Sequence, residues 1–268
     1  MPGEPDPLYV LARKVLLDAL SALESHLEAL ILVGAQAIYV HTGDADLALP
    51  EYTTDGDLAI APEDLGDSPL LEDALRAARL KPGNQPGRWT SLEEVYVDLL
   101  VPEALAGPGR RGADLGVHGR TVARRAKGLE GALVDRSRHT IGALDVADSR
   151  SYEIWIAGPA ALLVAKVHKI AERVGSPARE RDKDALDVLR LLRAVATTRL
   201  AGQLDVLGHD PLSAAVTTEA RTLFNGLFTR HDAEAVEMAV RAAGSEEDPE
   251  TIAASMMALA SDLLDVWP

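Results

Sequence analysis

The chain has 268 residues, of which 47% are hydrophobic and 4% aromatic, and this composition favours helices packed on a small sheet. The absence of cysteine excludes disulfides and thiolate metal sites, and the net charge of −15 disfavours broad nucleic-acid binding. No apolar run has membrane-spanning length and the N-terminus lacks a signal-peptide pattern, so we expect a cytoplasmic protein with no membrane partner.

The first predicted elements are a helix over about residues 8–26, which carries an apolar stripe, and an apolar strand over 30–33. This strand runs into Gly34, and a helix-like segment follows over 35–41. A glycine turn between strand and helix can bring backbone N–H groups and a helix N-terminus close to a polyphosphate. We therefore interpret Gly34 as a candidate phosphate-binding turn.

The segment 53–60, Thr-Thr-Asp-Gly-Asp-Leu-Ala-Ile, is predicted to be a strand with two carboxylates. Alternate residues share a strand face, so Asp55 and Asp57 are expected to point the same way. Two like charges side by side need a cation or a shared proton, and Mg²⁺ prefers carboxylate and phosphate oxygens. Asp-Gly is also a common turn dipeptide. The preceding glycine turn and a later strand carboxylate favour the metal-binding interpretation.

That later carboxylate is Asp98, in the predicted strand 93–101. Between the two strands, Asp67-Ser68-Pro69 predicts the start of a helix that extends to about Leu80. After them, residues 129–134 and 139–144 are predicted to be short strands or a hairpin, and residues 151–156 a strand.

Basic residues gather in the middle of this acidic chain. A local excess of positive charge suits an anionic substrate, and a solvated surface loop can have the same composition. The basic residues are Arg110, Arg111, Arg120, Arg124, Arg125, Lys127, Arg136 and Arg138.

The C-terminal part is predicted to be helical, with helices over about 160–174 and 181–197 and a loop over 175–179 between them. Lys166 lies inside an apolar run of the first helix, where a lysine needs an anionic partner, and it shares a helix face with Lys169. The residues alone favour a structural salt bridge from Lys166 to Asp184 on the second helix.

Together, these motifs resemble the AbiEii-type nucleotidyltransferases of the polymerase-beta-like superfamily, which include abortive-infection and toxin–antitoxin toxins. The resemblance covers about residues 30–195. It rests on the glycine turn, the Thr-x-Asp-x-Asp strand, the third Asp, Leu-Leu-x-x-Lys and Arg-x-Lys-Asp-x-x-Asp. It implies an α+β fold: an α/β nucleotidyltransferase core over 1–157, with a small mixed sheet flanked by helices, and a helical C-terminal domain over 158–268.

The resemblance also implies an activity, the Mg²⁺-dependent transfer of a nucleoside monophosphate from a nucleoside triphosphate to an acceptor hydroxyl. The 3′ end of tRNA is one implied acceptor, and a cognate antitoxin is an implied partner. The implied site residues are Asp55, Asp57 and Asp98 for the metal, Gly34, Ala35, Thr53, Lys166 and Lys169 for the triphosphate, and Asp184 to complete the catalytic site.

The chain departs from the family pattern at two places. Gly34-Ala35 stands where the family has Gly-Gly or Gly-Ser, so a hydroxyl that can touch phosphate is absent. Glu51-Tyr52 stands where an arginine often precedes the Asp motif. Two other interpretations stay open: an enzyme that modifies a small hydroxylated compound such as an aminoglycoside, which is cationic and suits an acidic protein, and an inactive scaffold with the same fold.

Overall fold

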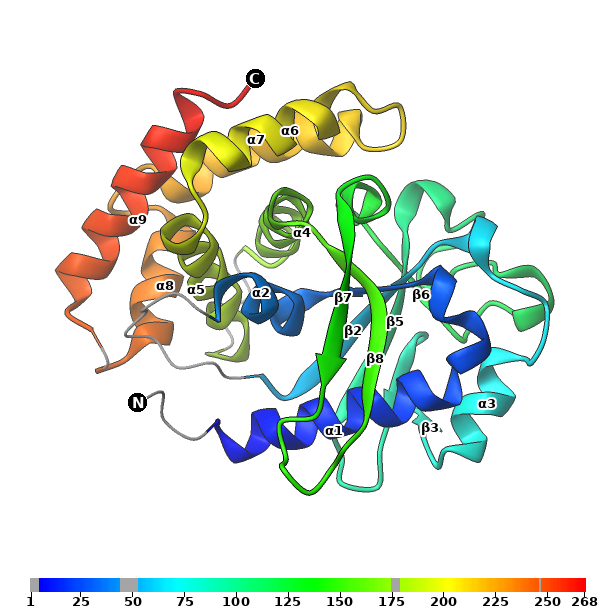
Figure 1. Cartoon of the computed structure of the whole chain (residues 1–268). Helices are drawn as coiled ribbons and strands as arrows, with labels where there is room; N and C mark the ends of the chain where they lie inside the picture. Colours follow the sequence, from blue (N-terminus) through cyan, green and yellow to red (C-terminus); the bar gives the residue numbers. More distant parts are fainter. Residues whose placement is uncertain (1–4, 44–52, 175–178, 246) are drawn as a thin grey trace. The chain divides into compact units, whose positions relative to one another are not determined.

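The computed structural model describes residues 5–43, 53–174, 179–245 and 247–268, and it is α+β, with a mixed sheet flanked by helices and a helical C-terminal region (Figure 1). The predicted fold class is confirmed at this level. The chain divides into two compact units. The first consists of residues 1–37, 51–126 and 136–157, and the second of residues 38–50, 127–135 and 158–268.

A mixed sheet forms the centre of the first unit (Figure 1). Its described strands are β1 (Leu30–Val33), β2 (Asp55–Ile60), β3 (Lys81–Pro82), β4 (Arg88–Thr90), β5 (Tyr96–Pro102), β6 (Arg124–Ala126), β7 (Arg136–Gly142) and β8 (Ser151–Ala157). They follow the order β3-β4-β5-β2-β1-β8-β7, and β6 pairs with β5 beside β4. The pairs β1–β8, β2–β5 and β5–β6 are parallel, and the other pairs are antiparallel.

Helix α1 (Pro7–Ala22) covers one face of this sheet and contacts β2, β5 and β8. Asp6 caps the helix, because its carboxylate accepts hydrogen bonds from the N–H groups of Leu8 and Tyr9. Leu16 is fully buried and packs against Gly56 of β2. The predicted first helix is confirmed, but it ends at Ala22, and a 3₁₀ helix, η1 (Glu24–Ala29), leads into β1.

The helix predicted to start at Asp67-Ser68-Pro69 begins later, as α3 (Leu71–Ala77), and this prediction of its start is wrong. The N–H of Leu71 donates to Nδ1 of His118, so a ring 47 residues away satisfies one of the donors at the start of the helix. Local sequence patterns do not contain such a tertiary partner. The loop residues of this segment therefore extend two positions further than the pattern indicates.

The strand predicted over 129–134 is also wrong, because Glu130–Leu133 form a 3₁₀ helix, η5. Its backbone closes local turns, such as Ala132 N–H to Leu129 O. A Cβ atom at Gly131 would lie within 3.4 Å of the Ala161 and Leu207 side chains, so the glycine faces these helices. Packing on helices thus replaces strand pairing here. The strands predicted over 139–144 and 151–156 correspond to β7 and β8. The predicted loop residues 175–178 and the pair Glu51-Tyr52 lie outside the described residues.

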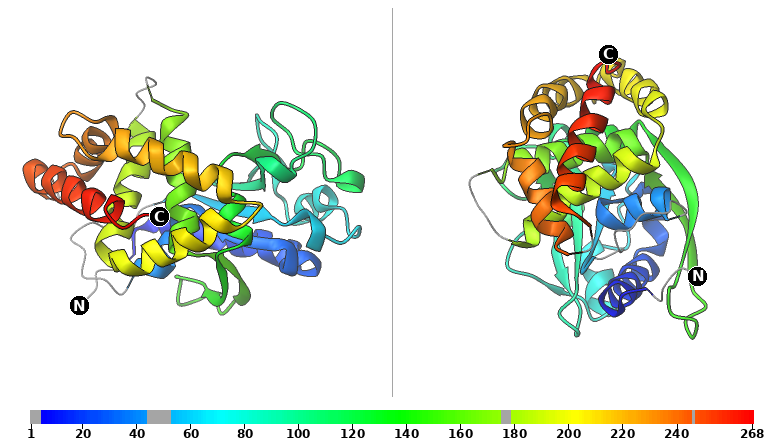
Figure 2. Two further views of the ribbon diagram at one scale, coloured as in Figure 1. Left: turned by 90° about the horizontal axis from the view of Figure 1, so that it is seen from above. Right: turned by 90° about the vertical axis from the view of Figure 1, so that its left-hand side faces the viewer.

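The described part of the second unit is mainly helical (Figure 2). Its helices from residue 158 onward are α4 (Pro159–Ala171), α5 (Arg179–Ala194), α6 (Thr197–His209), α7 (Ala214–Phe228), α8 (Glu234–Ala243) and α9 (Pro249–Leu264). Helix α4 packs against α5, α6 and α7, and α9 packs against α5 to α8. The two predicted helices with the Lys166 and Asp184 motifs are confirmed as α4 and α5. None of the described helices is long and apolar enough to cross a membrane.

Candidate functional site

Gly34 forms the junction between β1 and helix α2 (Gly34–Thr42), with a φ of +69° that glycine adopts without strain. A Cβ atom at this position would lie 2.1 Å from Oδ2 of Asp57. This close approach arises because β1 and β2 are antiparallel neighbours, with Val33 opposite Asp57. The structure therefore brings the predicted glycine turn directly against the second carboxylate of the Asp motif. Ala35 is buried in the first turn of α2.

Asp55 and Asp57 are both partly exposed on β2, separated by the buried Gly56. Since Gly56 faces Leu16 of α1, the two carboxylates lie on the opposite face of the sheet. We name this surface the carboxylate face, defined by Asp55, Asp57 and Asp98. The predicted shared orientation of Asp55 and Asp57 is confirmed, and their role as metal ligands stays a prediction.

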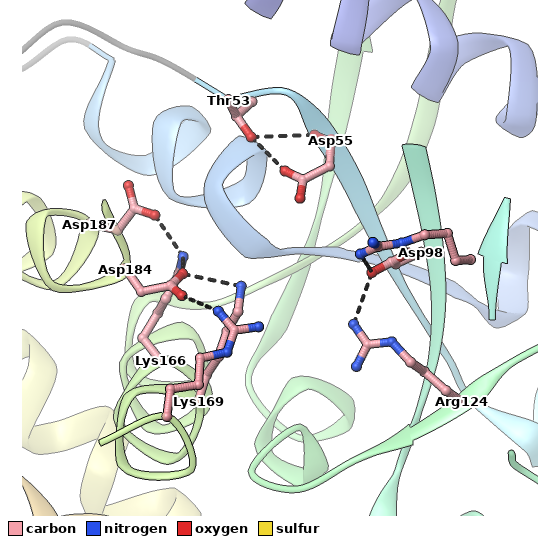
Figure 3. Close-up of polar contacts among 10 residues, drawn as sticks. Thr53, Asp55, Asp98, Arg124, Lys166, Lys169, Asp184 and Asp187 are labelled. Atoms are coloured by element: carbon pink, nitrogen blue, oxygen red, sulfur yellow. Dashed lines mark hydrogen bonds and ion pairs between the residues drawn. The ribbon is translucent and has the colours of Figure 1, made fainter. Parts of the chain in front are cut away.

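A hydrogen-bond chain fixes the position of Asp55. The Thr53 hydroxyl donates to Oδ1 of Asp55 at 2.8 Å (Figure 3). Nε2 of Gln36 donates to the Asp55 carbonyl at 2.9 Å, and Oε1 of Gln36 accepts from Nε of the buried Arg13 at 2.7 Å. Thr53 was expected at the site from the motif. Gln36 and Arg13 were not, although a glutamine in an otherwise apolar helix is a signal for a buried polar contact.

Asp98 lies on β5 opposite both Asp57 of β2 and Arg88 of β4. Its carboxylate is buried and accepts two hydrogen bonds of 3.0 Å from Nε and Nη2 of Arg88, and one of 2.9 Å from Nη2 of Arg124 (Figure 3). Burial raises the pKa of the Asp98 carboxyl, but the two guanidinium groups outweigh it and hold the pKa below its ordinary value. Asp98 is therefore a carboxylate ion shared by two arginines.

Gly87 brings the two arginines to the same carboxylate. Its φ is +78°, and a Cβ atom there would lie 2.4 Å from the Leu99 carbonyl oxygen and 2.6 Å from the backbone nitrogen of Arg124. Only a residue without a side chain fits between these backbones. Gly87 thus allows β4, which begins with Arg88, and β6, which begins with Arg124, to lie along the same edge of β5.

The described residues contain no group of three or more His, Cys, Asp or Glu side chains with metal-binding geometry. Asp55 and Asp57 supply two carboxylates, while both oxygens of Asp98 accept hydrogen bonds from arginines. Mg²⁺ is often bound by one or two carboxylates, with water and substrate phosphates as its other ligands. Asp55 and Asp57 fit that chemistry, and a metal bond to Asp98 would require it to release arginine contacts.

The second cluster of predicted site residues belongs to the helical unit. Nζ of Lys166 lies 2.6 Å from Oδ1 of Asp184 and 2.6 Å from Oδ2 of Asp187 (Figure 3). Asp184 also pairs with Lys169 at 3.1 Å and with Arg173 at 2.9 Å. The salt bridge that the sequence favoured is present, and Asp187 extends it. We name these five residues the lysine cluster.

Burial governs the electrostatics of the lysine cluster. Lys166 is 4% exposed and Asp184 1% exposed. Burial lowers the pKa of Lys166, but the charges of Asp184 and Asp187 outweigh it and raise the pKa above its ordinary value. Burial likewise raises the pKa of Asp184, and the neighbouring cations, with Lys166 foremost, outweigh it and lower the pKa. Lys166 and Asp184 are therefore charged at neutral pH. Lys169 and Arg173 lie at the surface, since each side chain is about one-third exposed.

The basic middle segment does not form one surface in the sheet. Arg124 begins β6, which pairs with β5, whereas Arg136 and Arg138 lie on β7, and strands β2, β1 and β8 separate β5 from β7. The guanidinium carbons of Arg136 and Arg138 lie 4.6 and 4.5 Å from the Trp155 ring centroid. Most of the basic residues have acidic partners: Arg120 with Asp114, Arg125 with Glu103, Lys127 with Glu219, Arg136 with Asp64 and Arg138 with Glu28. An RNA-binding role for this segment stays a prediction.

No protein-family model matches the chain, and no curated protein matches it either.

Proposed function

We propose that the protein is a Mg²⁺-dependent nucleotidyltransferase that transfers a nucleoside monophosphate from a nucleoside triphosphate to an acceptor hydroxyl. One observation carries the proposal: the Gly34 turn at the start of α2 lies against the Asp57 carboxylate. A phosphate near the backbone N–H groups of this turn would share its oxygens with a cation on Asp55 and Asp57. Neither the glycine turn nor the carboxylate pair supports this chemistry alone.

The residues of the carboxylate face have distinct roles in this proposal. Asp55 and Asp57 would hold the metal, which neutralises charge on the triphosphate and orients it for in-line displacement. Thr53 and Gln36 hold the Asp55 side chain and backbone, so that little reorganisation is needed when the metal binds. Gly34 leaves room for the Asp57 carboxylate beside the turn.

The lysine cluster of the helical unit has a net positive charge, because its three cations exceed its two carboxylates by one. Lys166 is buried between Asp184 and Asp187, so Lys169 and Arg173 are the cations of the cluster that are exposed to solvent. We assign to Lys166 and Asp184 the role of holding these two surface cations in place.

The acceptor has two candidate classes. The resemblance to toxins points to RNA, such as a tRNA 3′ end, and to a cognate antitoxin as a regulator. A cationic small molecule is favoured by a different observation: the net charge is −15, and most residues of the basic segment are ion-paired. A scaffold without activity would bind neither Mg²⁺ nor nucleotide.

The test is a transfer assay with Mg²⁺, each labelled nucleoside triphosphate, and either bulk tRNA or an aminoglycoside as acceptor. Asp55→Asn and Asp57→Asn are expected to abolish transfer, whereas Asp73→Asn, on the exposed side of α3, is a matched control that keeps it. Transfer by Asp57→Asn at the wild-type rate would contradict the proposal. Labelled product on tRNA or on the aminoglycoside identifies the acceptor class.

A further inference from the structure

We propose that Arg88 and Arg124, held together by the buried carboxylate of Asp98, form a binding site for the polyphosphate of the nucleotide, and that Asp98 is a positioning residue. The inference rests on the proposed function and adds two residues that the resemblance does not assign. It also replaces the expectation that Asp98 is a metal ligand.

Strand register places the two arginines on the carboxylate face. Arg88, Asp98 and Asp57 are direct partners in one row across β4, β5 and β2, and partners in register point to the same side of a sheet. Arg124 is the partner of Leu100, two residues beyond Asp98 on β5, so its side chain points to this side as well. Neighbouring strands lie about 4.8 Å apart. A polyphosphate of several phosphoryl groups is therefore long enough to extend from Asp57 on β2 to the arginines on β4 and β6.

Both guanidinium groups are oriented by the protein and still have donors for a ligand. Each side chain is 27% exposed. The two hydrogen bonds from Arg88 to Asp98 use two of the five N–H donors of the guanidinium. The guanidinium carbon of Arg88 lies 4.7 Å from the Tyr96 ring centroid, a cation–π contact that also holds the side chain. Nε of Arg124 is buried and meets no hydrogen-bond partner among the described residues. Arg124 donates to Asp98 through Nη2, and the partly exposed end of its guanidinium presents further N–H donors that a ligand oxygen can reach.

Charge balance explains why Asp98 acts as a positioning residue. Two guanidinium groups close together repel each other, and the shared carboxylate offsets that repulsion. The three carboxylates of the face exceed the two arginines by one charge. One divalent cation on Asp55 and Asp57 would reverse that sign and favour a polyanion. The arginines thus supply, on the Asp98 side of the face, the positive charge that a second metal ion would otherwise provide.

The first test measures binding of inorganic tripolyphosphate to the full chain by isothermal titration calorimetry in Mg²⁺. Arg88→Gln and Arg124→Gln are each expected to weaken binding roughly tenfold or more, because charge-assisted hydrogen bonds to phosphate are lost. Arg120→Gln removes the same charge from an exposed arginine that pairs with Asp114, and it is expected to bind like wild type. Arg124→Lys keeps the charge without the fork and is expected to bind with intermediate affinity. Absent binding by wild type, or unchanged binding in both Gln variants, would overturn the proposal.

A second arm separates the nucleotide from the acceptor as the source of the phosphate. Binding of a short single-stranded RNA without a 5′ triphosphate, followed by fluorescence anisotropy, is expected to change less than twofold in Arg88→Gln and Arg124→Gln. If these variants lose RNA affinity and keep tripolyphosphate affinity, the site serves the acceptor and the proposal is wrong.

A third arm tests the role of Asp98. Mn²⁺ affinity without nucleotide is measured by electron paramagnetic resonance, and it is expected to be unchanged in Asp98→Asn and strongly reduced in Asp57→Asn. The tripolyphosphate affinity of Asp98→Asn is expected to fall at least fivefold. A loss of Mn²⁺ affinity in Asp98→Asn that matches Asp57→Asn would make Asp98 a metal ligand. The transfer assay distinguishes the two proposals. If wild type binds tripolyphosphate through the arginines but transfers no nucleotide, only the proposed function is contradicted. If wild type transfers nucleotide but the arginine variants bind tripolyphosphate like wild type, only this binding site is contradicted.

Discussion

Asp57 and Asp98 lie directly opposite each other on the neighbouring parallel strands β2 and β5. Like charges in that position destabilise a strand pair. In this sheet, the charge of Asp98 is offset by Arg88 and Arg124, which reach it from the two strands that share the outer edge of β5. The ion pairs of Asp98 are therefore part of the stability of the sheet as well as of the candidate site.

Asp98→Asn is expected to lower the free energy of unfolding at pH 7 by about 3 kcal/mol, because it breaks a buried ion pair and leaves two arginines together. The pKa of Asp98 is lower in the folded chain than in the unfolded one. Its contribution is therefore fully present above the unfolded value of about 3.9 and is lost as the pH falls through the folded value. Urea unfolding from pH 7 to pH 3 should show the difference between wild type and Asp98→Asn shrinking below about pH 4. A difference that stays constant through pH 3 would contradict the assignment.

Gly34→Ala is expected to disturb the site and to destabilise the fold by about 1–3 kcal/mol. The added Cβ would meet Asp57 Oδ2, and the positive φ is unfavourable for alanine. Gly202→Ala is the matched control, because it lies exposed inside α6 with nothing within 4 Å, and alanine there should stabilise by about 1 kcal/mol. Urea denaturation and Mn²⁺ binding are the measurements. If Gly34→Ala bound Mn²⁺ with wild-type affinity, the Gly34 turn would not affect metal binding by the carboxylates.

Lys166→Ala is expected to lower the free energy of unfolding by roughly 3–5 kcal/mol, because it leaves Asp184 and Asp187 buried without their shared cation. Lys169→Ala removes a cation that is one-third exposed from the same carboxylate, and its cost should stay below about 1 kcal/mol. Thermal melting of both variants checks this contrast. Equal melting temperatures would mean that burial does not set the strength of the Lys166 pairs.

Gln36→Leu is expected to weaken metal binding without touching a metal ligand. It leaves Nε of Arg13 without its acceptor and the Asp55 carbonyl without its donor, which should cost about 1–3 kcal/mol in stability. Mn²⁺ affinity is expected to fall at a temperature where the variant is still folded. An unchanged affinity would show that Thr53 alone holds Asp55 in position.

The elements with strong local signals could be predicted from the sequence: the strand before Gly34, the Asp55–Asp57 strand, and helices α4 and α5. The pairing of Lys166 with Asp184 was also predictable, because a lysine in an apolar helix run needs a buried partner. The contacts of Asp98 were not. Arg88 and Arg124 reach it through strand pairings that depend on Gly87, and the sequence contains no local sign of that register. For the same reason, the basic segment looked continuous in the sequence and is divided between β6 and β7 in the structure.

The strand order has a consequence at the end formed by β3, which consists only of Lys81 and Pro82. Proline has no N–H to offer a new strand, and an exposed lysine repels another copy of the same edge. A two-residue edge strand of this kind is a poor template for hydrogen bonding to a strand of another chain. The sheet is therefore protected at β3 against edge-to-edge aggregation, even though it carries many fully buried aliphatic side chains in its central strands.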